Sequence, residues 1–399
     1  MRILVIAPWT PPTIRPQAIL LGKMLPSWQE QGMNVLLASF PTRWEFGGEK
    51  ISMPHVSISK TLFYKLLSRK FPADEAILKC WTSSLAKRLQ NELVDLIFSF
   101  ANPFWANRVG CQLSKILHIP FIAHFSDPYS GHPYKHRSPE EEAEAKKDEA
   151  NVVHQASKIV FVSGALNTAT MQKYSQFDRM KATVIPHAFS PASYQHRSAT
   201  WRDTSCFLVS HIGAFYKQRT PAILLKALAL FQNKYPEEAK SLRVNFVGAD
   251  LRYTDYSGDD LRAELSQYNF NFPVDILGSV PYEQSLTHMR DSHLLIAIDK
   301  DMARSPFLPS KIIDYIGSRT PVAAFTPQDS PTAEVVRRCG GDVFGYDQTA
   351  CENFADYVCQ MMSAKEQLEI PNEMVAGYSI NAQSLQYKKI FQEVLHREP

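Results

Sequence analysis

Basic, acidic and hydroxyl side chains stand close together in the sequence PSKIIDYIGSRTPVAAF, residues 309–325. The pattern predicts a short helix with Ser310 as its N-cap and Gly317 near its end. The free backbone N–H groups at the start of such a helix bind anions, and Lys311 adds a full positive charge there. We therefore interpret the start of this helix as a candidate phosphate site.

The same helical spacing separates an apolar face from a polar face that we expect to meet a ligand. The apolar face consists of Ile312, Ile313 and Ile316, and the polar face consists of Lys311, Asp314, Tyr315 and Ser318. Asp314 is placed to accept hydrogen bonds from vicinal hydroxyls such as those of ribose. The alternative is a solvent-exposed pair of Lys311 and Asp314 with no further role.

A second group of cations occurs in the sequence HIGAFYKQRTP, residues 211–221. We expect a strand to end at Gly213, and Lys217 and Arg219 to stand at the start of the following helix. Side chains of this kind hold a diphosphate by charge-assisted hydrogen bonds. Basic residues in a loop are also commonly just solvated, so this motif alone leaves both interpretations open.

A possible general base occurs in the first half of the chain, in the sequence HFSDPY at the end of a predicted strand, residues 124–129. The carboxylate of Asp127 could orient or deprotonate an acceptor hydroxyl group. An Asp-Pro pair is also typical of a simple turn. His124 is a second candidate on the acceptor side, but its place within an apolar run favours a structural role.

The sequence also contains a D-x-D pattern, residues 299–301, which could hold Mg²⁺ through carboxylate oxygens. We interpret it as an ordinary loop. The six cysteines contain no C-x-x-C and no paired spacing, which argues against a zinc site and against a disulfide framework. We expect no metal and no cofactor, and we expect the protein to be in a reducing cytoplasm.

The elements that must position these side chains alternate between strand-like and helix-like runs, as in parallel α/β layers. A chain of 399 residues favours two domains. The predicted strands are 2–7, 34–38, 95–100, 120–124 and 158–162 in the first half, and 206–212, 242–247, 274–277, 294–298 and 321–325 in the second. A capping box at Ser138 starts a charged helix.

The periodic pattern is lost over residues 184–202, so we place one Rossmann-like domain at 1–190 and a second at 191–379. A helix within 380–399 is a candidate to pack back on the first domain. Two such domains would face each other across a cleft at the carboxyl ends of their sheets, where open α/β folds bind ligands.

The ordered series of segments in the second half resembles the donor-binding half of the retaining GT-B glycosyltransferases of family 4. The series is HIGAFYKQRTP, NFVGAD, ILGSVPYEQ, LLIAID and PSKIIDYIGSRTPVAAF, with Glu334 following. The first half matches more loosely, through DLIFSFANPFW, IPFIAHFSDPY, KIVFVSGA and VIPHAF. The resemblance covers nearly the whole chain, and no single motif carries it alone.

The resemblance implies an α/β protein of GT-B fold that transfers a sugar from a nucleotide-diphosphate sugar without a metal. Arg219 and Lys311 would hold the diphosphate and stabilise the leaving group, with Gly213 allowing close approach of the backbone. Asp314 would hold the ribose, and Asp127 matches an acidic position in the family's cleft. Further donor contacts would come from Lys217, Ser310 and the loop Gly278, Ser279, Val280 and Tyr282, where the base would bind.

Two positions depart from the family's pattern of two glutamates eight positions apart. Asp314 stands for the second glutamate, and Pro306 occupies the place of the first. The family's glycine-rich loop after the first strand is replaced by PWTPPTIRPQ, so Arg15 or backbone groups would serve on the acceptor side. The loss of the first glutamate keeps open a non-catalytic nucleotide-sugar-binding partner subunit. A GT-B sugar-nucleotide epimerase is a further alternative, but it would need a pair of acid/base carboxylates in the cleft that the sequence does not identify.

The expected partners are a nucleotide-sugar donor and a saccharide or lipid-linked saccharide acceptor in assembly of a bacterial surface polysaccharide. A net charge of +3 gives no indication of nucleic-acid binding. No G-x-G-x-x-G follows a predicted strand, which disfavours a dehydrogenase. An apolar stripe beside lysines and arginines in residues 60–71 is typical of peripheral contact with an anionic membrane at the inner face of the cytoplasmic membrane. The same stripe also suits a helix packed on the first domain, and the sequence slightly favours that interpretation.

Overall fold

The computed structural model describes residues 1–54, 72–194, 205–248, 254–364 and 369–396. The chain divides into two compact units. The first unit contains Met1–His187 together with Ile380–Pro399, and the second contains Ala188–Ser379. The apolar and basic stripe predicted at 60–71 lies outside the described residues.

Within the described ranges, the first unit holds a seven-stranded parallel sheet in the order β3-β2-β1-β4-β5-β6-β7. Its strands are β1 (Arg2–Ile6), β2 (Asn34–Ser39), β3 (Glu49–Ser52), β4 (Leu96–Phe100), β5 (Phe121–Phe125), β6 (Lys158–Phe161) and β7 (Ala182–Val184). The central strands β4 and β5 are buried along their whole length, as strands covered on both faces must be. The strand order reverses between β1 and β4, which makes this pair the topological switch point.

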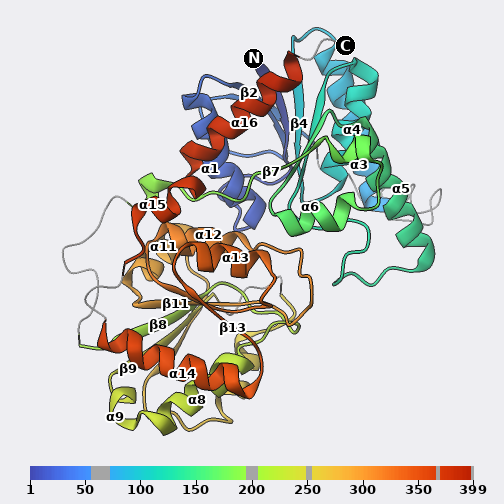
Figure 1. Ribbon diagram of the computed structural model, residues 1–399. Helices are drawn as coiled ribbons and strands as arrows, with labels where there is room; N and C mark the ends of the chain where they lie inside the picture. The colour runs from blue at the N-terminus through green and yellow to red at the C-terminus, as the bar shows by residue number, and fades with distance from the viewer. Residues whose placement is uncertain (55–71, 195–204, 249–253, 365–368, 397–399) are drawn as a thin grey trace. The chain divides into compact units, whose positions relative to one another are not determined.

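Helices cover both faces of this sheet (Figure 1). They are α1 (Pro16–Glu30), α3 (Pro72–Leu89), α4 (Trp105–Leu117), α5 (Pro139–Gln155), α6 (Gly164–Met171), α7 (Gln176–Arg179) and α16 (Ile380–Leu395). The predicted capping box of α5 is present, because the Ser138 hydroxyl accepts the N–H of Glu141 and the Glu141 carboxylate accepts the N–H of Ser138.

Helix α16, which is last in the chain, lies beside α1 in the first unit (Figure 1). Trp28 of α1 packs against Tyr387 and Phe391 of α16, with ring centroids 5.1 Å apart in both pairs. All three rings also contact Phe98 of β4. The hydroxyl groups of Ser384 and Ser27 are 2.9 Å apart. An aromatic layer therefore joins residues near both ends of the sequence.

The second unit holds a six-stranded parallel sheet over the described residues, in the order β10-β9-β8-β11-β12-β13. Its strands are β8 (Phe207–Ile212), β9 (Leu242–Val247), β10 (Val274–Leu277), β11 (Leu294–Ile298), β12 (Val322–Phe325) and β13 (Asp342–Phe344). The order reverses between β8 and β11. The carboxyl ends of these two strands therefore flank the switch point of the second unit.

Helices α8 (Ala222–Lys234) and α14 (Gln348–Ser363) pack together on one face of the second sheet, and α11 (Tyr282–Asp291), α12 (Ser310–Gly317) and α13 (Pro331–Arg338) lie on the other (Figure 1). The core between the sheet and the α8–α14 pair includes Phe231, Phe246 and Phe354. Short helices complete the unit: η1 (Pro191–Tyr194), α9 (Pro236–Ala239), α10 (Gly258–Leu265), α15 (Asn372–Val375) and η3 (Ala376–Tyr378).

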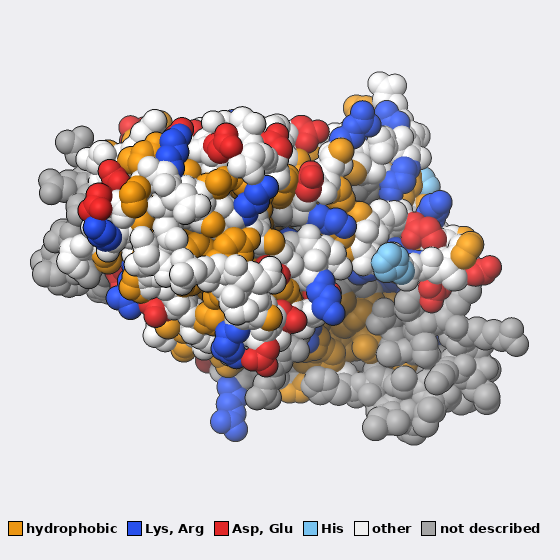
Figure 2. Space-filling model, turned by 90° about the horizontal axis from the view of Figure 1, so that it is seen from below, with side chains coloured by type: hydrophobic (Ala, Val, Ile, Leu, Met, Phe, Trp, Pro, Cys, Tyr) orange, Lys and Arg blue, Asp and Glu red, His pale blue; other side chains and the backbone are white. Residues whose placement is uncertain are grey.

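The surface seen in Figure 2 carries positive and negative side chains interspersed with apolar ones, in keeping with the small net charge of +3. Across the part of the chain that is described, every helix is too short or too polar to cross a lipid bilayer.

Candidate functional site

The clearest candidate site lies where β8 and β11 end in the second unit. Gly213 follows β8 directly with φ of 127°, and Gly248 follows β9 with φ of 83°. Both values favour glycine, because side chains clash at positive φ. The backbone atoms of Gly213 lie 3.6 Å from where a Cβ of Gly248 would stand. Two bare backbone segments thus meet at this edge of the sheet.

Lys311, the second residue of α12, brings its amine to the same place. A Cβ on Gly213 would lie 3.2 Å from Lys311 Cδ and 3.4 Å from its Nζ. Burial and the charge of Arg219 hold the pKa of the Lys311 amine well below its ordinary value, with Asp299 acting in the opposite direction. A nearby anion would be drawn to this poorly solvated amine.

His211, in β8, joins Lys311 to the sheet. Its Nε2 is 3.1 Å from Lys311 Nζ, and its Nδ1 is 2.9 Å from the carbonyl oxygen of Ile296 in β11. The residue is 1% exposed, and its ring stacks on Phe215 with centroids 4.3 Å apart. Burial, followed by the charge of Lys311, lowers the pKa of His211 well below its ordinary value. The imidazole is therefore neutral at physiological pH.

Arg219 and Lys217 lie in the loop between β8 and α8. The backbone of Tyr216 and Arg219 forms a tight turn, and the Arg219 guanidinium lies 4.7 Å from the centre of the Tyr216 ring. Helix α8 begins only at Ala222, so the prediction that both cations stand at the start of a helix is wrong. Pro221 delays the start of the helix and leaves a loop that carries them. The Lys217 side chain is exposed.

Helix α12 is fixed against β8 by its buried side chains. Tyr315 is fully buried, its hydroxyl accepts the N–H of Ile212 at 2.7 Å, and it donates to the carbonyl of Ile212 at 2.8 Å. The predicted polar face of this helix is therefore wrong at Tyr315, which binds the sheet backbone. Ser318 is also buried, and its hydroxyl donates to the Tyr315 carbonyl at 2.7 Å.

The start of α12 differs from the prediction by one residue. Pro309 is the N-cap, with φ of −61° and ψ of 130°, and Ser310 is the first helical residue. The prediction of Ser310 as N-cap is therefore wrong, because the fixed φ of proline already provides the extended residue that precedes the first turn. Gly317 is the last residue of the helix, and a Cβ there would lie 2.5 Å from the Phe189 ring.

Asp314 lies deeper than the predicted ribose contact requires. It is 5% exposed, and its carboxylate accepts a hydrogen bond of 3.0 Å from the hydroxyl of Tyr282. The Tyr194 hydroxyl donates to the Asp314 carbonyl at 2.9 Å. Tyr282 is the first residue of α11, and the loop before it, Gly278, Ser279 and Val280, connects β10 to that helix. The carboxylate of Asp314 and this loop are thus joined through Tyr282.

In the first unit, the loop after β1 contains Trp9 and Arg15. The Arg15 guanidinium lies 4.1 Å from the centre of the Trp9 ring, and the ring of Trp9 is tilted against Phe40 at 5.2 Å. Arg15 directly precedes α1, which starts with Pro16. Its side chain is exposed at the carboxyl edge of the first sheet, beside the switch point between β1 and β4.

Asp127 and Asn102 meet at the carboxyl ends of β5 and β4. The amide of Asn102 donates to the carboxylate of Asp127 and, at 3.3 Å, to the hydroxyl of Ser126. His124 lies within β5, is 2% exposed and stacks on Phe100 with centroids 4.5 Å apart. Burial lowers the pKa of His124 to about 3. Asp127 is thus at the sheet edge, whereas His124 is part of the core.

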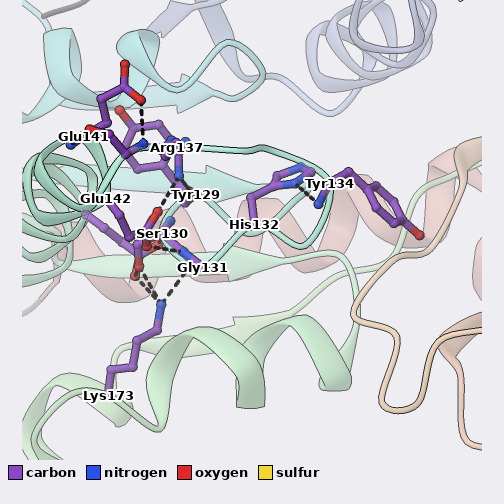
Figure 3. A network of polar contacts seen from close by, with 11 residues as sticks. Tyr129, Ser130, Gly131, His132, Tyr134, Arg137, Glu141, Glu142 and Lys173 are labelled. Carbon is purple, nitrogen blue, oxygen red and sulfur yellow. Dashed lines mark hydrogen bonds and ion pairs between the residues drawn. The ribbon is translucent and has the colours of Figure 1, made fainter. Parts of the chain in front are cut away.

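A polar network fixes the loop that follows Asp127 (Figure 3). The buried carboxylate of Glu149 accepts hydrogen bonds from Ser130 and Tyr174. It also forms an ion pair of 2.7 Å with the amine of Lys173. Arg137 donates to the carbonyl of Tyr129 at 2.6 Å. In Figure 3, His132 and Tyr134 extend away from this network. Helix α5, Arg137 just before it, and the residues that follow α6 therefore hold the loop in place.

The D-x-D sequence follows β11. The carboxylate of Asp299 accepts a hydrogen bond of 2.9 Å from Thr326, and Asp299 is 7% exposed. The described residues contain no cluster of three or more His, Cys, Asp or Glu side chains suited to a metal ion. The first carboxylate of the pattern therefore joins the ends of β11 and β12 through the side chain of Thr326.

Sequence reasoning missed four residues that shape the site in the second unit, namely His211, Gly248, Tyr315 as an anchor and Tyr194. The contact of His211 with Lys311 joins residues 100 positions apart, and that of Tyr315 with Ile212 joins residues 103 positions apart. No local sequence pattern predicts contacts over such separations. A usable signal was the position of His211 two residues before Gly213, at the end of a predicted strand.

No family model and no curated protein matches the sequence. Solved structures are similar over nearly the whole chain. Anabaena Alr3699/HepE in complex with UDP-glucose has 16% sequence identity and a TM-score of 0.64, covering 99% of this chain and 98% of that one. Sucrose-phosphate synthase from Thermosynechococcus elongatus has 14% identity and a TM-score of 0.72, covering 99% of both chains.

The lipopolysaccharide outer core galactosyltransferase WaaB, in its apo form, has 8% identity and a TM-score of 0.63, covering 98% of this chain and 99% of that one. Identities this low establish the fold alone. The chain has the GT-B architecture of two Rossmann-like units, as the sequence predicted.

Proposed function

We propose that the protein is a glycosyltransferase that moves a sugar from a nucleotide-diphosphate sugar to a saccharide or lipid-linked saccharide acceptor. The observation that carries the proposal is the edge formed by Gly213, Gly248 and Lys311. Bare backbone and a poorly solvated amine at the switch point of a parallel sheet suit a diphosphate. The similar fold of HepE, solved with UDP-glucose, makes a UDP-sugar the first donor to test.

In the proposed reaction, the bond between the anomeric carbon and the diphosphate oxygen breaks as the acceptor oxygen bonds to that carbon. Negative charge then develops on the leaving diphosphate, where Lys311 and Arg219 stabilise it. The acceptor proton passes to Asp127 or to a phosphate oxygen of the departing nucleotide. No metal takes part in this scheme. Retention of configuration and a role in bacterial surface-polysaccharide assembly are parts of the proposal.

The remaining predicted residues have roles within the same scheme. Asp314 would receive the ribose hydroxyls, which requires Tyr282 to share or release the carboxylate. The loop of Gly278, Ser279 and Val280 would contact the base. Lys217 and Ser310 would supply further contacts to the diphosphate, and Arg15 would face the acceptor. We place the protein in the cytoplasm, with peripheral membrane contact where the acceptor is lipid-linked.

A thermal-shift screen of UDP, GDP and their sugars tests the donor site. At a ligand concentration about 100 times Kd, binding stabilises the folded state by about 2.7 kcal/mol. We expect Lys311→Met to weaken diphosphate binding by about 1.5–3 kcal/mol, because a charge-assisted hydrogen bond is lost. Lys240→Met is the matched control, since Lys240 pairs at the surface with Glu237. If no nucleotide raises the melting temperature of the wild type, the donor site does not exist.

Turnover separates the proposal from its alternatives. Proton NMR of a nucleotide sugar incubated with the wild type should show slow hydrolysis, with the released sugar first in the configuration of the donor. An inverted product would overturn retention. Binding without any turnover would favour a non-catalytic partner subunit, and an epimerised sugar would favour an epimerase.

A further inference from the structure

The imidazole of His211 is held in one orientation and one tautomer. A carbonyl oxygen can only accept, so Nδ1 carries the hydrogen that is donated to Ile296 at 2.9 Å. Nε2 then has a lone pair and must accept, and the Lys311 amine donates to it at 3.1 Å. A rotation of the ring by 180° would break both contacts, and stacking on Phe215 in a buried position opposes it.

Residues of both strands that flank the switch point thus help to hold the Lys311 amine in place. His211 belongs to β8, Ile296 belongs to β11, and Lys311 enters from α12. The chain of contacts runs from the Ile296 carbonyl through the imidazole to the amine, which lies beside Gly213. An unrestrained lysine side chain loses rotamer entropy when it binds a ligand. A lysine that is already held loses less.

We propose that His211 is a positioning residue, whose Nε2 holds the Lys311 amine at Gly213 so that the remaining N–H groups point to a diphosphate. This inference rests on the proposed donor site. An ammonium group has three hydrogens, of which His211 takes one and phosphate oxygens receive the other two. The histidine does not touch the substrate and acts only through Lys311.

Two substitutions separate this role from simple filling of space. His211→Gln puts an amide oxygen where Nε2 stands and can still accept from Lys311. His211→Asn puts its amide near the place of Nδ1, where it can still donate to the Ile296 carbonyl but cannot reach Lys311. A residue that only supports the fold would be replaced at least as well by asparagine as by glutamine. Titration calorimetry with UDP and GDP measures the consequence.

We expect His211→Asn to weaken nucleotide diphosphate binding at least tenfold and His211→Gln to stay within about threefold of the wild type. In a Lys311→Met background, His211→Asn should have no further effect on Kd, because the two residues act as one unit. Equal affinity of the wild type and the asparagine variant, or additive effects of the two substitutions, would overturn the inference.

Two measurements are independent of nucleotide binding. Nitrogen NMR of the wild type should show a protonated Nδ1 and a bare Nε2 for His211, assigned by the loss of its signals in His211→Gln. A crystal structure of ligand-free His211→Asn should show Lys311 Nζ moved away from Gly213. The opposite tautomer, or an unmoved amine, would refute the positioning role even if the diphosphate binds. Failure of the wild type to bind any nucleotide, with the tautomer as expected, would instead refute the proposed function and, with it, the diphosphate as the ligand of the held amine.

Discussion

The imidazoles of His211 and His124 both lie at the ends of buried parallel strands, and burial lowers the pKa of each. Their surroundings differ. His211 is joined to the amine of Lys311 at the sheet edge, whereas His124, in β5, packs against the Phe98 and Phe100 rings of β4. A histidine one residue before the end of a buried parallel strand thus serves a candidate site in one unit and the core in the other.

The buried His124 makes the first unit sensitive to acid. Its pKa is about 3 in the folded state and 6.5 in the unfolded chain, so only the unfolded chain takes up a proton between these values. The contribution of neutral His124 to stability is therefore complete above pH 6.5 and is lost as the pH falls towards 3. Linkage puts the loss at about 2 kcal/mol between pH 7.5 and pH 5.

We expect His124→Leu to remove this part of the acid dependence, measured as the free energy of unfolding in urea at pH 7.5 and pH 5. His136→Gln is the matched control, because His136 is exposed and should leave the acid dependence unchanged. An equally steep loss of stability in His124→Leu would contradict the assignment.

At the residue scale, the sequence singled out Gly213 and Lys311, which the structure brings together, but it did not indicate their partner His211. Lys311 was predicted to stand near Gly213 only through a family resemblance. Its contact with His211 joins residues 100 positions apart, and no local rule predicts such a pair. Tyr315 fits the polar face of a helical wheel, yet its hydroxyl satisfies the backbone of β8. Periodicity cannot distinguish a polar atom that faces water from one that is buried and bonded.

At the scale of elements, α12 is the part that positions the candidate site. Its eight residues are attached to β8 through Tyr315 and to η1 through the Tyr194–Asp314 contact. Phe189 packs where Gly317 leaves no room for a side chain. The place of the Lys311 amine therefore depends on contacts at the far end of the helix as well as on His211.

Two tyrosine substitutions compare these anchors. Tyr315→Phe leaves the buried N–H of Ile212 without the hydroxyl that accepts it, and we expect a loss of about 1–3 kcal/mol in the free energy of unfolding. Tyr194→Phe should cost less, because the Asp314 carbonyl still accepts the N–H of Ser318. Urea unfolding of both variants measures the difference, and a larger loss for Tyr194→Phe would contradict this account.

The ten strands predicted from the sequence are all present, with ends shifted by at most one residue. Their buried apolar runs give a strong signal because parallel strands are covered on both faces. The sequence missed β3, β7 and β13, which are three or four residues long and stand at sheet edges. An edge strand such as β7 is partly exposed and has neither an apolar run nor a regular alternation.

At the scale of the whole molecule, α16 belongs to the first unit, although it follows the whole second unit in the sequence. Phe391 is fully buried between Trp28 and Phe98, although it lies 363 residues beyond Trp28 in the chain. The sequence suggested a helix here as a candidate to pack back, but composition alone does not reveal which of two similar sheets a final helix covers.

We expect Phe391→Ala to lower the free energy of unfolding of the first unit by about 3–5 kcal/mol, because a large cavity is left in the aromatic layer. Leu385→Ala on the same helix is the control, since Leu385 is 55% exposed. Five of the six tryptophans lie in the first unit, so fluorescence during urea unfolding reports mainly on it. An unchanged tryptophan transition in Phe391→Ala would contradict this role of α16.

The position of α16 in the sequence also determines which of the two units is complete first during translation. A ribosome completes residues 188–379 before it adds the helix that covers Trp28. Until then Trp28 lacks the α16 rings that cover it, and transiently exposed apolar surface of this kind favours aggregation. The second unit, although later in the sequence, is thus the first for which every residue of the fold is available during translation.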